Sequence, residues 1–154
     1  MKVMTKVEFK KLESVENIKE VVANLFDIEL NIAGGWGYGS ESALKVEQLD
    51  IPIEQFINMF TTLRSNVEMN FDKKEKYGGI TLSLEELKSL DIDNTPYQIA
   101  RFNLSAMSEK VSAEFIKEYK ENYGKKEFDI GEHFKRRKEQ TLTRVVECWF
   151  YMKE

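Results

Sequence analysis

The chain has one cysteine, Cys148, and one histidine, His133, among its 154 residues. A single cysteine cannot close a disulfide within the chain, and together with one histidine it cannot complete a four-ligand zinc site. Prolines number only two, and no apolar run is long enough to cross a bilayer. These absences exclude disulfide-stapled folds, zinc clusters built from Cys and His, and membrane-spanning helices.

An excess of charge of one sign is also missing. The 23 basic and 27 acidic side chains leave a net charge of -4, and neither half of the chain is strongly polarised. A chain-wide basic surface for nucleic acid or for anionic membranes is therefore not expected. What the chain does have is 42% apolar and 12% aromatic residues, which is enough for a buried core. We predict a single domain over residues 1–154.

The N-terminal segment indicates a compartment. Lysines at positions 2, 6, 10 and 11 interrupt the apolar stretch that a secretory signal needs. Together with the lone cysteine, they favour a reducing, cytoplasmic location. We interpret the excess of lysine over arginine as a sign of an AT-rich bacterial genome.

Hydrophobic periodicity divides the first half of the chain into helices and short strands. Apolar residues at helical spacing predict a helix over residues 15–25, and strict alternation predicts a half-buried strand over residues 26–32. Residues 44–46 fit a returning strand, although a short helix also fits. A strong helix is predicted over residues 53–63. The charged stretch DKKEKYGG, residues 72–79, is predicted to be a surface connection.

In the second half, candidate helix caps dominate. Residues 83–86 have the capping-box pattern and predict a short helix. Residues 97–111 fit a helix, but their YQIARFNL segment also fits a strand. Residues 113–123 predict a helix, and residues 129–132 form another capping box. Residues 141–152 are rich in β-branched and aromatic side chains and predict a strand, with a helix as the alternative.

Together these elements predict an α+β fold, in which several helices cover a small antiparallel sheet. The alternative is an all-α fold, because residues 97–111 and 141–152 fit either state. The C-terminal segment is too apolar to form an exposed edge strand. We therefore expect it either centrally in a sheet or against a second copy of the chain, which makes a homo-oligomer through this segment one of the arrangements considered.

The segment Gly34–Ser40 (GGWGYGS) is the least ordinary part of the sequence. Gly34 and Gly39 have the spacing of the two glycines of a phosphate-binding P-loop, but Ser40 and Glu41 follow where Lys and Ser or Thr are required. The dinucleotide-binding pattern also fails, because Ser40 replaces its third glycine. We therefore predict neither a nucleotide site nor any other cofactor.

Two interpretations of this loop remain. In the first, the glycines form a flexible connection and the two aromatic rings fold back onto the sheet. In the second, Trp36 and Tyr38 are exposed anchors for a ligand or a partner protein. The candidate binding residues are then Trp36, Tyr38, Gly35, Gly37, Gly39 and Ser40.

The remaining reactive side chains favour ordinary roles. Cys148 lies in the apolar run VVECWFY and is predicted to be a core residue, whereas His133 is predicted to be a solvated surface residue. A Cys–His nucleophilic pair is therefore not favoured. The one basic patch is Lys135, Arg136, Arg137 and Lys138. Four consecutive helical residues do not share one face, so a solvated surface is favoured over contact with nucleic acid or an acidic partner.

No metal site is predicted from the sequence. The segment Asp91-Ile92-Asp93-Asn94 is similar to the start of a calcium loop, but Pro96 and Phe102 stand where glycine and glutamate are required. We predict a turn between two helices there instead.

The sequence therefore predicts a non-enzymatic module that binds a ligand or a protein through the Gly34–Ser40 loop. The alternative is a small-molecule enzyme that uses carboxylate or tyrosine acid–base chemistry in a pocket under the same loop. No catalytic residue can be assigned from the sequence, and neither can the identity of the ligand.

Overall fold

One mixed β-sheet organises the protein in the computed structural model, which describes residues 2–5, 8–71 and 75–152. Its main path has the strand order β2-β3-β6-β5-β4. The strands are β1 (Lys2–Val3), β2 (Ile32–Gly34), β3 (Leu44–Val46), β4 (Tyr77–Ile92), β5 (Thr95–Ser108) and β6 (Leu142–Met152). The helices are α1 (Ile18–Phe26), α2 (Ile53–Asn70), α3 (Glu109–Asn122) and α4 (Ile130–Gln140), with a 3-10 turn η1 (Ser40–Ser42). The predicted α+β class is confirmed.

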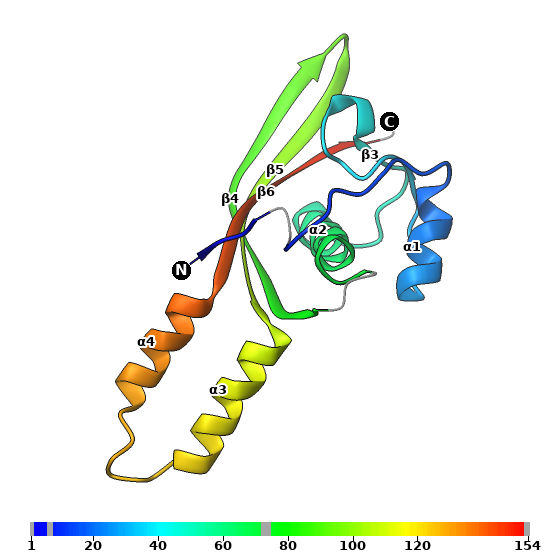
Figure 1. Ribbon diagram of the computed structural model, residues 1–154. Helices are drawn as coiled ribbons and strands as arrows, with labels where there is room; N and C mark the ends of the chain where they lie inside the picture. Colours follow the sequence, from blue (N-terminus) through cyan, green and yellow to red (C-terminus); the bar gives the residue numbers. More distant parts are fainter. Residues whose placement is uncertain (1, 6–7, 72–74, 153–154) are drawn as a thin grey trace.

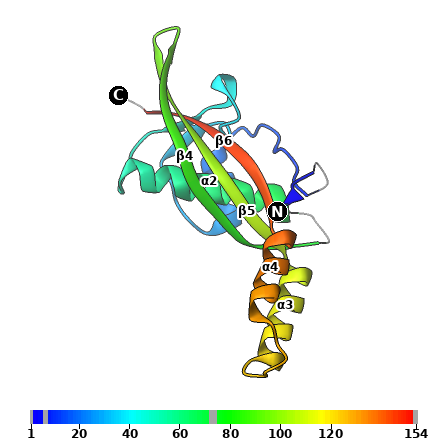
Figure 2. The ribbon, with the colours of Figure 1, turned by 90° about the vertical axis from the view of Figure 1, so that its left-hand side faces the viewer.

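Helices α1 and α2 lie on one face of the sheet, and the opposite face is free of helices in the described part of the chain (Figures 1 and 2). Helix α2 packs Phe56 and Phe60 against Phe150 of β6, with the Phe60 and Phe150 ring centroids 6.0 Å apart. Helices α3 and α4 project from the end of β5 and the start of β6 as a hairpin that points away from the sheet (Figure 1).

Strands β4 and β5 form a long hairpin, where the sequence predicts a short helix at residues 83–86 and leaves residues 97–111 open between helix and strand. They pair from Tyr77 with Ser108 to Ile92 with Thr95. The hairpin closes through Asp93 and Asn94, which both have left-handed φ angles, of 49° and 66°, as a tight two-residue β-turn requires. The helix predicted at residues 83–86 and the turn between helices are wrong, because a capping box is a local preference that strand pairing overrides. Residues 97–108 are strand, and α3 begins only at Glu109.

Other boundaries shift less. Helix α1 begins at Ile18 and is capped by the side chain of Asn17, which accepts from Glu20 N at 3.1 Å. The strand predicted over residues 26–32 is wrong except at Ile32, the first residue of β2. Phe26 still belongs to α1, which Asp27 ends in a left-handed conformation with a φ of 54°. The Asp129 cap of α4 is present, since its side chain accepts from Glu132 N at 3.0 Å.

Two further segments can be compared with their predictions. Of the connection predicted at residues 72–79, residues 72–74 lie outside the described part of the chain, and Tyr77–Gly79 already belong to β4. Strand β6 lies between β3 and β5, so its central position is confirmed. Cys148 in this strand is fully buried, as expected of a core residue. Among the described residues, no helix is both long and apolar enough to cross a membrane.

Candidate ligand pocket

The glycine-aromatic loop folds into the protein and does not project from it. Trp36 is only 3% exposed, and its ring stacks on Phe60 of α2 at a centroid distance of 6.2 Å. Gly37 has a φ of 90° and lies so close to β6 that a Cβ on it would meet Cys148 Sγ at 2.6 Å. Its carbonyl also accepts a hydrogen bond from Trp149 N at 2.7 Å. The expectation of an exposed Trp36 is therefore wrong, because glycine lets the loop approach the sheet closely enough to bury the ring.

Tyr38, the second expected anchor, is half-buried. Its hydroxyl donates to Glu68 Oε2 at 2.6 Å and accepts from Leu12 N at 3.0 Å. The ring lies between Lys11 Nζ, 4.9 Å from its centroid, and the Arg64 guanidinium, 4.5 Å away. Burial, reinforced by the Glu68 carboxylate, raises the pKa of Tyr38 well above its ordinary value. The phenol therefore remains a protonated hydrogen-bond donor.

The remaining candidate binding residues of the loop contribute to its backbone conformation. A Cβ on Gly35 would lie 2.5 Å from Ser42 O, so the chain passes too close there for a side chain. Gly39 has open space around it, and Ser40 begins η1. The loop therefore supplies one buried ring, one half-buried ring and the close backbone contacts that hold them.

A buried ion cluster behind the loop was missed in the sequence. Arg64 and Glu68 are almost fully buried, and Arg64 donates to Trp36 O at 3.2 Å and to Glu147 O at 2.8 Å. Arg144 Nη1 lies 3.5 Å from Glu68 Oε1. Burial lowers the pKa of Arg144, and Glu68 opposes that effect. The sequence did contain a signal for the burial of these two residues. Arg64 and Glu68 follow Phe56 and Phe60 at intervals of four residues, so all four lie on the same face of the helix.

A hollow of about 440 Å³ lies beside Trp36, between residues 10–15, α1 and the C-terminal turns of α2. Its apolar wall is formed by Leu12, Val15, Val21, Leu25, Val67 and Phe71, together with Trp36. A neighbouring hollow of about 390 Å³ shares the lining residues Leu25, Val67 and Phe71 with it. Cavities of this size with mostly apolar walls are typical of small-molecule sites.

One polar atom distinguishes this hollow. Trp36 Nε1 is buried and has no hydrogen-bond partner among the described residues. Buried indole N–H groups usually have a partner, and leaving a buried donor unpaired costs about 1–3 kcal/mol. Trp36 lines the hollow with other atoms of its side chain or backbone, so its Nε1 becomes available to an acceptor on a bound molecule only when the surrounding wall shifts.

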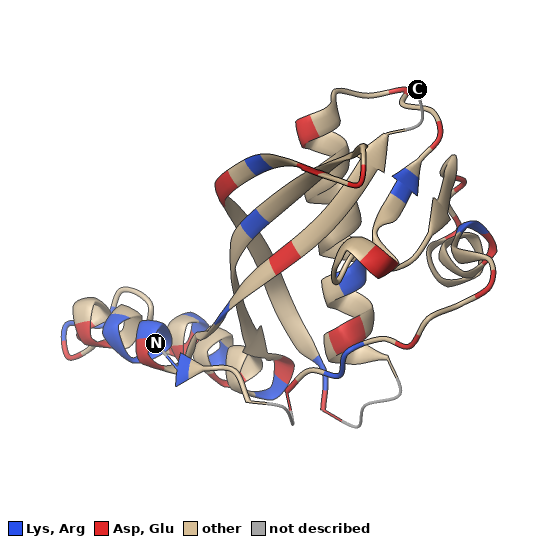
Figure 3. Ribbon diagram, turned by 90° about the horizontal axis from the view of Figure 1, so that it is seen from above, with Lys and Arg blue, Asp and Glu red and all other residues tan. Residues whose placement is uncertain are grey.

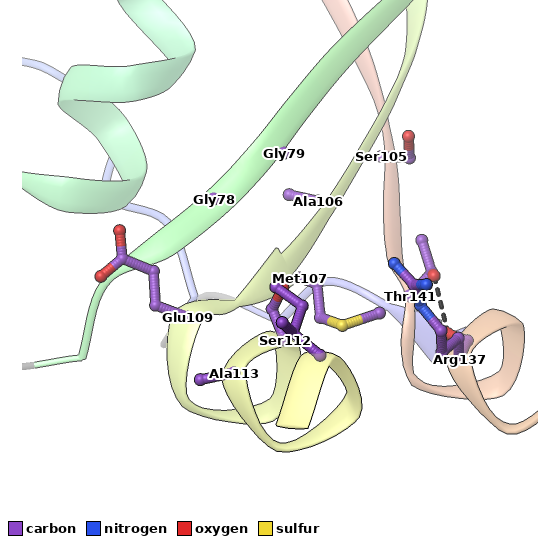
Figure 4. Close-up of a pocket in the computed structure, with 11 residues that line it drawn as sticks. Gly78, Gly79, Ser105, Ala106, Met107, Glu109, Ser112, Ala113, Arg137 and Thr141 are labelled. Carbon is purple, nitrogen blue, oxygen red and sulfur yellow. Dashed lines mark hydrogen bonds between the residues drawn. The ribbon is translucent and has the colours of Figure 1, made fainter. Parts of the chain in front are cut away.

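The root of the helical hairpin holds another hollow, of about 400 Å³. Figure 4 shows its lining, with Glu109 and Arg137 on opposite sides of Met107 and Ser112, and with the Glu109 carboxylate turned away from Arg137. Small residues such as Gly78 supply much of the remainder of this lining. No atom of that lining is among the buried polar side-chain atoms without a partner in the described residues. The hollow beside Trp36 is therefore the better candidate.

The basic patch does not form one surface. Arg136 donates to Glu118 Oε2 at 3.1 Å and makes a second bond to the same carboxylate, while Arg137 lies 5.7 Å over the ring of Phe134. Figure 3 shows basic and acidic residues mixed along this hairpin. Lys135 and Lys138 are exposed. The four cations thus point in different directions, and one of them is neutralised.

His133 is not the solvated residue that the sequence predicts. It is fully buried, with its Nδ1 3.3 Å from Glu118 Oε1. Its ring lies within 5.8 Å, centroid to centroid, of the rings of Phe115, Tyr119 and Phe128. The correction has a simple cause: a helical hairpin that leaves the sheet needs a small core of its own, and His133 fills its centre.

The sheet face opposite to α1 and α2, which we call the outer face, carries an aromatic cluster that the sequence analysis did not single out. Tyr97 meets Trp149 and Tyr151 edge to face, at centroid distances of 5.7 and 5.8 Å. A hollow of about 260 Å³ adjoins it, lined in part by Leu90, Ile99 and Trp149. The signal was the alternation within β6, where Trp149 and Tyr151 lie on the opposite face from Cys148.

No group of three or more His, Cys, Asp or Glu side chains within residues 2–5, 8–71 and 75–152 is arranged to hold a metal ion. Comparisons with protein-family models, curated proteins and solved structures found no match to this chain. The function is therefore inferred from the geometry of the hollow beside Trp36.

Proposed function

We propose that this protein is a non-enzymatic binding module that holds a small apolar molecule in the pocket beside Trp36. The observation that carries the proposal is an apolar hollow of about 440 Å³, whose lining residue Trp36 has a buried Nε1 without a partner among the described residues. The ligand class is an apolar molecule with an oxygen acceptor, such as a ketone, ester or carboxylate. The proposal includes the cytoplasmic location favoured by the sequence.

The energetics of the pocket support this ligand class. Apolar walls favour binding by about 25 cal/mol for each Å² of apolar surface removed from water. A hydrogen bond from Trp36 Nε1 adds about 0.5–1.5 kcal/mol, which is roughly 2- to 12-fold in affinity. The pocket is therefore expected to prefer a carbonyl compound over a hydrocarbon of the same shape.

The chemistry around the loop favours binding over catalysis. Tyr38 and Glu68 are the acid–base pair that an enzyme would use, but they are hydrogen-bonded to each other at 2.6 Å. The Glu68 carboxylate is fully buried, and the raised pKa of Tyr38 disfavours its ionisation. Neither residue lines the hollow beside Trp36. Proton transfer to a molecule bound there is consequently not part of the proposal.

The test compares acetophenone with ethylbenzene, which have similar size and shape but differ in the carbonyl oxygen. In a ¹⁵N-correlated NMR spectrum, the two indole N–H signals are assigned with Trp36→Phe and Trp149→Phe. Acetophenone should shift the Trp36 signal and bind roughly 2- to 12-fold more tightly than ethylbenzene. In Trp36→Phe this preference should disappear, whereas Trp149→Phe should keep it. Equal affinity for both compounds in the wild type would refute the proposed hydrogen bond.

A second candidate is a homodimer formed through the outer face of the sheet. Strand β5 pairs one edge of β6, and β1 and β3 pair the two ends of the other edge, so the proposed contact uses the face that carries Trp149 and Tyr151. The uncovered aromatic cluster is the observation that favours it, since exposed Trp and Tyr side chains are enriched at interfaces. Light scattering should then give twice the monomer mass. Trp149→Ala should lower that mass, and Tyr123→Ala on the α3–α4 hairpin should not.

A further inference from the structure

One wall of the Trp36 pocket is formed by an irregular segment, Glu8–Asn17, which we call the strap. It precedes α1 and contains no helix or strand. Within residues 2–5, 8–71 and 75–152, two hydrogen bonds donated by its main chain attach it to α2 and to the glycine-aromatic loop: Lys10 N donates to Glu68 O at 2.9 Å, and Leu12 N donates to the Tyr38 hydroxyl at 3.0 Å. The strap therefore forms one wall of the pocket with few backbone hydrogen bonds to the rest of the described chain.

The side chains that hold the strap converge on a single buried carboxylate. Glu68 Oε2 accepts from the Tyr38 hydroxyl at 2.6 Å, and Tyr38 in turn accepts from the strap. Glu68 Oε1 lies 3.5 Å from Arg144 Nη1, and the Arg144 guanidinium lies 3.6 Å from the ring centroid of Phe9 in the strap. Glu68 thus fixes both groups against which the strap rests.

We propose that the strap is the gate of the Trp36 pocket and that Tyr38 is its latch. The inference rests on the proposed function, because a gate has a role only if a ligand enters. Trp36 lines the pocket and yet is only 3% exposed, so access to its ring requires a wall to move. Segments with few buried contacts and few backbone hydrogen bonds open at the lowest free energy. The strap has few backbone hydrogen bonds, and its apolar side chains Phe9, Leu12 and Val15 are only partly buried against the core that α2 and β6 form.

Tyr38 is suited to be a latch because one hydroxyl joins the strap to α2. As an acceptor it holds Leu12 N, and as a donor it is fixed by Glu68. Tyr38→Phe removes both bonds and leaves the ring between Lys11 and Arg64. The substitution therefore releases the strap without emptying a core position.

The experiment measures hydrogen exchange by mass spectrometry in Tyr38→Phe, with Tyr97→Phe on the outer face as the matched control. Amides of strap peptides around Leu12 should exchange roughly 2- to 12-fold faster in Tyr38→Phe, as expected for the loss of one net hydrogen bond. Peptides of α2 and β6 should be unchanged. In a Trp149→Phe background, acrylamide should also quench the fluorescence of Trp36 more strongly in Tyr38→Phe.

A second variant tests the other attachment. Phe9→Leu removes the ring under Arg144 and keeps an apolar side chain, so it should accelerate exchange in the same strap peptides. Unchanged strap exchange in Tyr38→Phe would overturn the latch, and so would an equal increase throughout α2 and β6. These measurements use no ligand, so a failed latch is distinguishable from a failed comparison of acetophenone with ethylbenzene.

Discussion

Replacing Trp36 with alanine should destabilise the protein strongly, because the ring is a core element and not an exposed anchor. The side chain is 3% exposed and stacks on Phe60 at 6.2 Å. Truncation of a buried aromatic residue to alanine costs about 3–5 kcal/mol, through lost burial and the cavity left behind. A chain of this size loses roughly 2–4 °C of Tm per kcal/mol, so the expected fall is about 6–20 °C.

Trp149 supplies the matched control. It is the only other tryptophan, lies half-buried on the outer face of the sheet, and meets Tyr97 edge to face at 5.7 Å. Trp149→Ala loses an aromatic pair worth about 0.5–1.5 kcal/mol and some partial burial, but it opens no enclosed cavity. We therefore expect it to cost clearly less than Trp36→Ala.

The assay is urea unfolding followed by far-UV circular dichroism, with the wild type and both variants measured at one protein concentration. A change of midpoint at constant m-value reports the change in the free energy of unfolding. If Trp36→Ala costs no more than Trp149→Ala, the ring is not part of the core. The assignment of Trp36 to the pocket wall would then be wrong as well.

Two further predictions concern the loop and the helical hairpin. Gly37→Ala should destabilise the protein by roughly 2 kcal/mol or more, because its φ of 90° is strained for alanine and the new Cβ would lie 2.6 Å from Cys148 Sγ. Gly39→Ala, with open space around it, should change stability by less than about 0.5 kcal/mol in the same urea assay. Arg136 lowers the pKa of Glu118 below its usual 4.5, so the stabilisation from this pair is fully present above that pH. This stabilisation should be lost as the pH falls through the lowered pKa of Glu118. Amides of α3 should then lose protection against hydrogen exchange over that pH range in the wild type, and Glu118→Gln should show no such pH-dependent loss.

Elements with a long and regular pattern could be predicted from the sequence. The helical periodicity within 15–25, 53–63 and 113–123 identified α1, α2 and α3, although α2 continues to Asn70. The β-branched and aromatic segment 141–152 favoured a strand over a helix, and the structure places that strand, β6, between β3 and β5. In each case the signal is the repeat of apolar residues along the element itself, which does not depend on knowing its neighbours.

Local signals failed where distant pairing decided the outcome. The capping box at residues 83–86 is a real preference of the chain, but the pairing of β4 with β5 places these residues in a strand. His133 looked like a surface residue because charged residues surround it in the sequence. Its burial depends on α3, whose Phe115 and Tyr119 enclose it. Such positions are set by contacts between elements and not by neighbours along the chain.

By itself, the sequence located the main helices and excluded an internal disulfide and a Cys/His zinc cluster, and it favoured the α+β class and a strand at residues 141–152 over their helical alternatives. It also singled out the Gly34–Ser40 loop, but not the direction in which its rings point. Only the tertiary structure decided that Trp36 is buried at a pocket and that Tyr38 joins Leu12 to Glu68. The physical reason is that these contacts join residues about 30 positions apart, such as Tyr38 and Glu68, whose approach depends on how the helices and the sheet pack.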